Sequence, residues 1–107
     1  MAEPPAAIAG IPGLPPETSA RLLAVLSAEP AVQEVWLYGS RAMGRHRPGS
    51  DIDLTLVGPN LRHHDRLRLM AALDDLLLPW SIDLSLQHEL PESLRQHVAR
   101  VGQRLTL

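Results

Sequence analysis

The stretch VWLYGSRAMGRHRPGSDIDLTLV, residues 35–57, decides the fold of this chain. Its first residues are apolar, β-branched and aromatic, which predicts a short strand that ends at Gly39-Ser40. Its last seven residues, 51–57, alternate between polar and apolar side chains, as a strand with one buried face does. The polar residues 41–50 between them contain glycine and proline and predict a turn-rich connection, with one helical turn at its start.

The rest of the chain adds helices and further strands to this pair. The predicted helices cover about residues 16–28, 61–77 and 91–101, and the predicted strands cover 80–86 and, as a candidate edge strand, 104–107. In the middle helix we expect Leu67 and Leu77 on or near the buried stripe. Together the elements predict an α+β fold, in which helices pack on one face of a small mixed sheet and carboxylates occupy the other.

The N-terminal residues differ in composition from the rest. Residues 1–16 hold five of the ten prolines, set among alanines and glycines. Because their few apolar groups cannot offset the entropy lost on ordering, we predict a flexible N-terminal arm. Residues 17–107 then form one domain, since 107 residues leave no room for a second core.

Composition excludes several classes of function. The absence of cysteine rules out disulfides, thiolate metal sites and cysteine nucleophiles. The net charge is −2 and every fixed cation is an arginine, so we expect no direct binding of long nucleic acid, which requires a large positive excess. No apolar run approaches the roughly 20 residues that span a bilayer. The N-terminus does not resemble a signal peptide, and we predict a cytoplasmic protein.

Three aspartates are expected to share the polar face of the sheet. Asp51 and Asp53 lie at i and i+2 in one strand, so their side chains emerge about 6.6 Å apart on one face. Asp83 occupies a polar position of the strand over residues 80–86. Their mutual repulsion calls for protonation or a compensating cation, and carboxylate oxygens are preferred magnesium ligands. The pattern predicts a catalytic site in which the three aspartates hold two Mg²⁺ ions on either side of a reacting phosphorus.

The turn at Gly39-Ser40 predicts the other half of the site. Glycine lets the backbone approach a ligand closely, and backbone N–H groups with a serine hydroxyl can hold phosphate oxygens. We expect Gly39, Ser40 and Arg41 to bind the phosphates of a nucleotide. The histidines, including His97, lack any ligand spacing and are interpreted as surface residues.

The combination resembles a known family. Gly-Ser followed by ten residues, 41–50, and then Asp-x-Asp resembles the signature of the minimal nucleotidyltransferases of the polymerase β superfamily. The resemblance extends over roughly residues 17–107 and includes Asp83 as the third aspartate. Asp51 to Leu56 also resemble the Asp-x-Asp-x-Thr-Leu motif of haloacid dehalogenase phosphatases. That motif follows a buried strand, whereas here the hydrophobic strand comes after the aspartates.

The resemblance implies a function and a partner. Ser40 would bind the terminal phosphates of the nucleotide, Asp51 and Asp53 would ligate both magnesium ions, and Asp83 would help activate the acceptor hydroxyl. Small members of the family resemble antitoxins that transfer AMP from ATP to a tyrosine of a HEPN ribonuclease toxin. The resemblance therefore implies an adenylyltransferase that acts on such a toxin. Two alternatives stay open: an antitoxin that neutralises the toxin by binding alone, and nucleotidyl transfer to a small molecule.

Overall fold

The computed structural model describes residues 7–107 and contains one four-stranded mixed sheet. Its strands are β1 (Glu34–Tyr38), β2 (Ile52–Val57), β3 (Ile82–Leu86) and β4 (Gln103–Leu105), in the order β3-β2-β1-β4. The strand β1 is antiparallel to both β2 and β4, whereas β2 and β3 are parallel. The four strands fall where the sequence predicts them, within one or two residues at most ends, and the predicted α+β class is confirmed.

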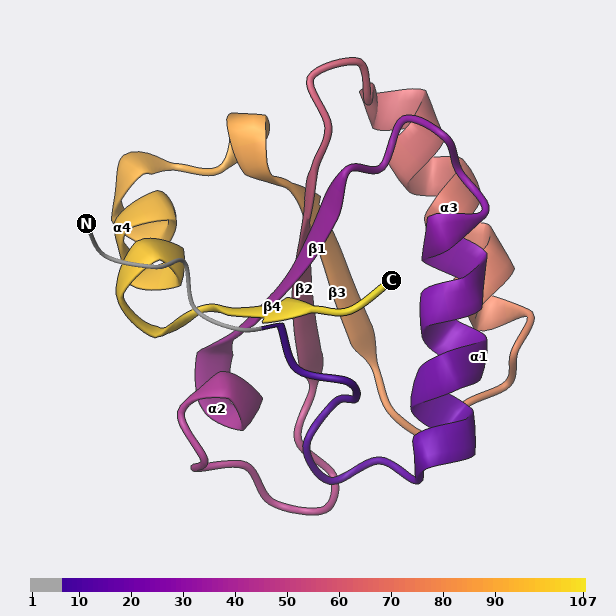
Figure 1. Ribbon diagram of the computed structural model, residues 1–107, viewed down its shortest axis with the longest axis vertical. Helices are drawn as coiled ribbons and strands as arrows, with labels where there is room; N and C mark the ends of the chain where they lie inside the picture. The colour runs from indigo at the N-terminus through magenta and orange to yellow at the C-terminus, as the bar shows by residue number, and fades with distance from the viewer. Residues whose placement is uncertain (1–6) are drawn as a thin grey trace.

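Two helices cover one face of the sheet. The helices α1 (Pro16–Ser27) and α3 (His63–Asp74) lie on the same side of the strands in Figure 1. Alternate residues of the central strands, such as Leu54 and Leu56, are fully buried against them. Each such side chain contributes about 1.5–3 kcal/mol relative to an exposed position. The expected stripe of α3 is wrong at Leu67, which is 49% exposed, and Leu77 lies beyond the end of the helix.

The opposite face is partly covered, which corrects the expectation of helices on one face only. The short helix α2 (Gly39–Ala42) and the last helix α4 (Glu92–Val101) lie on this side of the sheet in Figure 1. Val98 of α4 is buried, and Gly102 at the end of the helix lies against the ring of Trp36. Trp36 provides apolar surface on the face that also bears the aspartates, and α4 packs Val98 there.

Part of the predicted arm is packed into the domain. Ile8 pairs with Leu105 of β4, and its N–H donates to the carbonyl of Arg104 at 2.8 Å. Ile11 is 2% exposed in the core, where its N–H donates to Ser19 Oγ at 3.0 Å. These two isoleucines supply the apolar burial that the prolines around them lack. Residues 1–6 of the predicted arm lie outside the described residues.

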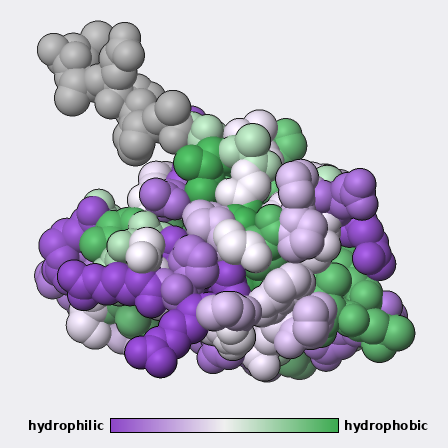
Figure 2. Space-filling model, turned by 90° about the horizontal axis from the view of Figure 1, so that it is seen from below, coloured by the Kyte–Doolittle hydropathy of each residue, from purple (hydrophilic) through white to green (hydrophobic). Residues whose placement is uncertain are grey.

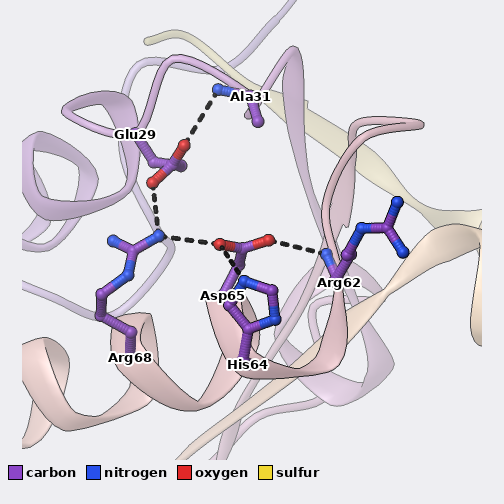
Figure 3. A network of polar contacts seen from close by, with 6 residues as sticks. All are labelled: Glu29, Ala31, Arg62, His64, Asp65 and Arg68. Carbon is purple, nitrogen blue, oxygen red and sulfur yellow. Dashed lines mark hydrogen bonds and ion pairs between the residues drawn. The ribbon is translucent and has the colours of Figure 1, made fainter.

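A surface network ties the end of α1 to the start of α3 (Figure 3). Arg68 donates to Glu29 at 2.7 Å and to Asp65 at 3.0 Å. Asp65 also accepts the N–H of Arg62 at 2.8 Å, which caps the first turn of α3. The hydrogen bond from Arg68 is the main cause that lowers the pKa of Glu29, and the N–H of Arg62 is the main cause for Asp65. The network links the segment that follows α1 to the first two turns of α3.

Among residues 7–107, no helix combines the length and the apolar character that a bilayer span requires. Seen from the side of α2, hydrophilic residues gather at the end of the molecule that carries α2 and α4 (Figure 2). This is the end at which the predicted site residues lie.

Candidate active site

The parallel pairing of β2 and β3 brings two of the predicted aspartates together. Asp53 and Asp83 are direct partners in the register of these strands, so their side chains leave the sheet on the same face. Both line a pocket of about 520 Å³. The other lining residues come from the end of β1, from the following glycine and from α4: Tyr38, Gly39, Ser93, Leu94, His97 and Arg100. The strand register thus places two carboxylates at the mouth of one concave site.

The negatively charged carboxylates of this site repel one another. Partial burial is the main cause that raises the pKa of the Asp53 carboxyl, and the negative charges of Asp83 and Asp51 raise it further. His97 acts in the opposite sense and lowers it. Asp51 is exposed immediately before β2 and does not line the pocket, although its charge is felt at Asp53. The site therefore carries an excess of negative charge that a cation would relieve.

Gly39 joins the end of β1 to α2 and adopts a φ of +74°. A β-carbon at this position would overlap Oδ2 of Asp53. Only glycine combines this left-handed backbone with so close an approach to a carboxylate. Ser40 follows, half-buried in the single turn of α2. The turn that the sequence predicts as a phosphate cradle therefore lies directly beside the carboxylates.

Arg41 has a different role from the one predicted. Its side chain is 2% exposed, and its guanidinium donates to the carbonyl of Pro12 at 2.8 Å and to that of Ser50 at 2.7 Å. Burial lowers the pKa of Arg41, although an arginine remains charged in proteins. The donors of the Arg41 side chain face the protein interior, so the structure does not bring this predicted nucleotide ligand to the pocket that Asp53 and Asp83 line. It connects α2 to the N-terminal segment and to the residue before Asp51.

His97 is the residue that sequence reasoning missed. The N–H of Gly39 donates to Nε2 of His97 at 3.3 Å. The imidazole also meets the ring of Tyr38 edge-on, with centroids 6.2 Å apart and planes at 81°. One signal was available: His97 lies four residues before Val101 and next to Val98, and this spacing places it near the apolar side of α4. The interpretation of His97 as a surface residue is wrong.

The carboxylates do not form a closed metal cage by themselves. Among residues 7–107, no group of three or more histidine, aspartate or glutamate side chains converges to hold a metal ion. Sites for magnesium commonly take one or two carboxylates and complete the shell with water and phosphate oxygens. Asp53 and Asp83 supply carboxylates of this kind from neighbouring strands.

Comparison with known proteins assigns this arrangement to a family. Residues 21–106 match the family described as polymerase beta nucleotidyltransferase. The chain therefore belongs to the polymerase β-type nucleotidyltransferases, and the resemblance drawn from Gly39-Ser40 and the aspartates is confirmed. The position of β2, which begins after Asp51 rather than before it, agrees with this family and not with the phosphatase motif.

Individual relatives narrow the similarity to the minimal members. A Haemophilus influenzae protein named as the probable protein adenylyltransferase MntA is 34% identical over 68 residues, 63% of this chain and 60% of that protein. The chain thus spans less than two thirds of this curated relative. A protein assigned as a minimal nucleotidyltransferase has a solved structure that is 33% identical with a TM-score of 0.60, covering 82% of this chain and 90% of that one.

Complexes provide further structural matches. A chain from a toxin–antitoxin crystal structure with AMP-PNP is 26% identical with a TM-score of 0.69, covering 81% of this chain and 71% of that chain. A chain from a complex of a tri-AMPylated Shewanella oneidensis HEPN toxin with an MNT antitoxin shares the fold at 23% identity. Its TM-score is 0.65 over 84% of this chain and 70% of that chain.

Proposed function

We propose that this chain transfers AMP from ATP to a hydroxyl group of a partner protein, a HEPN ribonuclease toxin, and thereby acts as its antitoxin. The observation that carries the proposal is the pairing of Asp53 with Asp83 in register, directly beside the Gly39-Ser40 turn. In the transfer, the acceptor oxygen bonds to the α-phosphorus of ATP, and the bond from that phosphorus to the β-phosphate oxygen breaks. Pyrophosphate leaves, and the hydroxyl proton passes to a carboxylate or to water.

The donor half of the site fits a magnesium-bound nucleotide. Asp51, Asp53 and Asp83 would hold two Mg²⁺ ions together with phosphate oxygens and water. Partial burial and the neighbouring carboxylates raise the pKa of Asp53, and a cation would offset this cost of its negative charge. When bound, magnesium supplies positive charge that stabilises a transferring phosphoryl group. Gly39 and Ser40 would hold the terminal phosphates through backbone N–H groups and the serine hydroxyl. The presence of AMP-PNP in one structurally similar complex supports ATP as the donor.

The acceptor half rests on Asp83 and on the relatives. Asp83 is exposed on the edge strand β3, where an incoming hydroxyl can reach it, and we assign it the activation of that hydroxyl. The Haemophilus influenzae relative is named as a protein adenylyltransferase, and the HEPN toxin of one complex with this fold carries AMP groups. The first supports a protein as the acceptor, and the second supports an acceptor of the HEPN class. A partner of this kind also fits our prediction of a cytoplasmic protein.

The test is direct transfer of label to the partner. The full chain is incubated with its partner protein, magnesium and ATP labelled in the α-phosphate or the adenine, and the partner is analysed by mass spectrometry. We expect AMP on a tyrosine, and no AMP with Asp53→Asn or when EDTA is present. A matched control is Asp75→Asn on the exposed end of α3, which should transfer as the parent does.

Two outcomes would overturn the proposal. A folded partner that stays unlabelled while ATP is consumed with a metabolite would indicate transfer to a small molecule. An Asp53→Asn chain that neutralises the toxin in cells as well as the parent would indicate that binding alone is sufficient.

A further inference from the structure

His97 is the only side chain of α4 within the described residues that hydrogen-bonds to the Gly39-Ser40 turn, and it does so from 58 positions along the chain. The contact joins two helices that are far apart in the sequence. The helix α2 belongs to the Gly-Ser and Asp-x-Asp signature, whereas α4 lies outside it. Its acceptor is the imidazole Nε2 and its donor the backbone N–H of Gly39. The ring is half-buried and is held from the side by the edge of Tyr38.

This hydrogen bond lies at a sensitive point of the backbone. Gly39 has a φ of +74°, and its own α-carbon faces Asp53 so closely that no side chain fits between them. Any rotation of the peptide before Gly39 therefore moves either the turn that carries Ser40 or the carboxylate of Asp53. Because Gly39 has no side chain to hinder such rotation, a hydrogen bond to its N–H restricts the peptide. Nε2 of His97 accepts that bond.

We infer that His97 is a positioning residue of the nucleotidyl-transfer site, which fixes the Gly39 peptide and through it the carboxylate of Asp53. The inference rests on the proposed function for its kinetic consequence and on geometry alone for its structural one. The imidazole acts as an acceptor at Nε2, so it carries its hydrogen on Nδ1 when the bond is formed. It makes no contact with the reacting atoms in this assignment.

A pair of substitutions separates this role from simple packing. In His97→Gln, the side-chain amide oxygen can occupy the place of Nε2 and accept the same N–H, whereas His97→Leu fills similar space with no acceptor. We expect kcat for AMP transfer to fall on the order of tenfold to a hundredfold in His97→Leu, as for other displaced catalytic groups. The KM for ATP should change less than kcat. His97→Gln should remain within about threefold of the parent, and so should His88→Leu, which makes the same exchange at an exposed histidine.

A spectroscopic measurement tests the geometry without reference to activity. In ¹⁵N-labelled full chain, a long-range proton–nitrogen spectrum should show His97 with hydrogen on Nδ1, and the Gly39 amide proton should shift in His97→Leu but much less in His97→Gln. Equal loss of activity in the Gln and Leu variants, or a Gly39 amide proton indifferent to both, would overturn the inference. If the parent itself transfers no nucleotide, the proposed function fails, and the Gly39 and His97 resonances alone then decide the positioning role.

Discussion

Gly39 lies against Asp53 so closely that a β-carbon on residue 39 would overlap the Oδ2 atom of the aspartate. The contact connects the end of β1 with the neighbouring strand β2 and sets the distance between the turn that follows β1 and the first paired carboxylate. It also explains why glycine and aspartate occur together in this site. Glycine is required at position 39 both by the nearby carboxylate of Asp53 and by the positive φ of its own backbone.

The first prediction concerns Gly39→Ala. The added methyl group must displace Asp53, so AMP transfer should fall by at least about a hundredfold, the order of loss that follows an ångström-scale misplacement. The positive φ adds about 1–2 kcal/mol of destabilisation. Transfer assays and thermal unfolding measure the two effects separately.

Gly44→Ala is the matched control for that substitution. Gly44 has a φ of +70°, but a β-carbon there would meet nothing within 4 Å. The variant should lose a similar amount of stability and keep its activity. Comparable activity in the two alanine variants would show that the contact with Asp53 has no catalytic importance.

The second prediction concerns Arg41. In Arg41→Met the partly buried carbonyls of Pro12 and Ser50 lose their donors, and leaving a buried group unpaired costs about 1–3 kcal/mol. We expect the free energy of unfolding to drop by roughly 3 kcal/mol, measured by denaturant titration. Arg45→Met, at an exposed position of the same connection, should change it by less than about 0.5 kcal/mol. Unchanged stability with a selective loss of ATP affinity would instead restore Arg41 as a phosphate ligand.

The observed positions of Arg41 and His97 show what the sequence can and cannot predict here. Strand alternation places Asp53 and Asp83 on one face, because the period of a strand is a local property. The burial of Arg41 depends on carbonyls at Pro12 and Ser50, and the contact of His97 depends on Gly39, 58 residues away. Neither partner carries a side-chain signal, since both contacts are made to backbone atoms.

The placement of α4 and of the N-terminal segment escaped prediction for a related reason. Amphipathic spacing shows that a helix buries one side, but not which face of the sheet receives it. Trp36 makes the aspartate face partly apolar and so accepts α4. In the proline-rich segment, composition predicts a flexible arm, whereas in its described part, residues 7–16, Ile8 pairs with β4 and Ile11 is buried in the core.

The third prediction follows from the raised pKa of Asp53. A carboxyl whose folded-state pKa lies above its unfolded value favours folding below the unfolded pKa, and this contribution is lost as pH rises through the folded pKa. At pH 7.5 without metal, ionised Asp53 therefore destabilises the chain, and Asp53→Asn should raise the unfolding temperature. The gain should shrink as the pH falls toward about 4, near the unfolded pKa of aspartate. Asp75→Asn should show no comparable gain. An Asp53→Asn chain less stable than the parent at pH 7.5 would contradict the unfavourable burial and repulsion that raise the pKa of Asp53.

The fourth prediction concerns metal and nucleotide. Magnesium with a non-hydrolysable ATP analogue at about a hundred times its dissociation constant should stabilise the parent by roughly 2.7 kcal/mol. For a domain of this size the unfolding temperature should rise by several degrees, and EDTA should reverse the rise. The shift should be much smaller in Asp53→Asn, which retains the fold but lacks the charge. An equal shift in both chains would place the metal–nucleotide complex elsewhere on the molecule.

The last prediction concerns the network of Glu29, Asp65 and Arg68, remote from the site. The hydrogen bond from Arg68 is the main cause that lowers the pKa of Glu29. The ionised form of Glu29 therefore favours folding above the unfolded pKa, and this contribution is lost as pH falls through the folded pKa. Glu29→Gln keeps an acceptor for Ala31 N–H but removes the charge. Its unfolding temperature should fall slightly at pH 7, less so in high salt, and match the parent in acid, as thermal melts across pH will measure. Transfer activity should not change, because the network joins α1 to α3 on the face of the sheet opposite the aspartates. A change in kcat would show that the two helices influence the geometry of the site through the sheet.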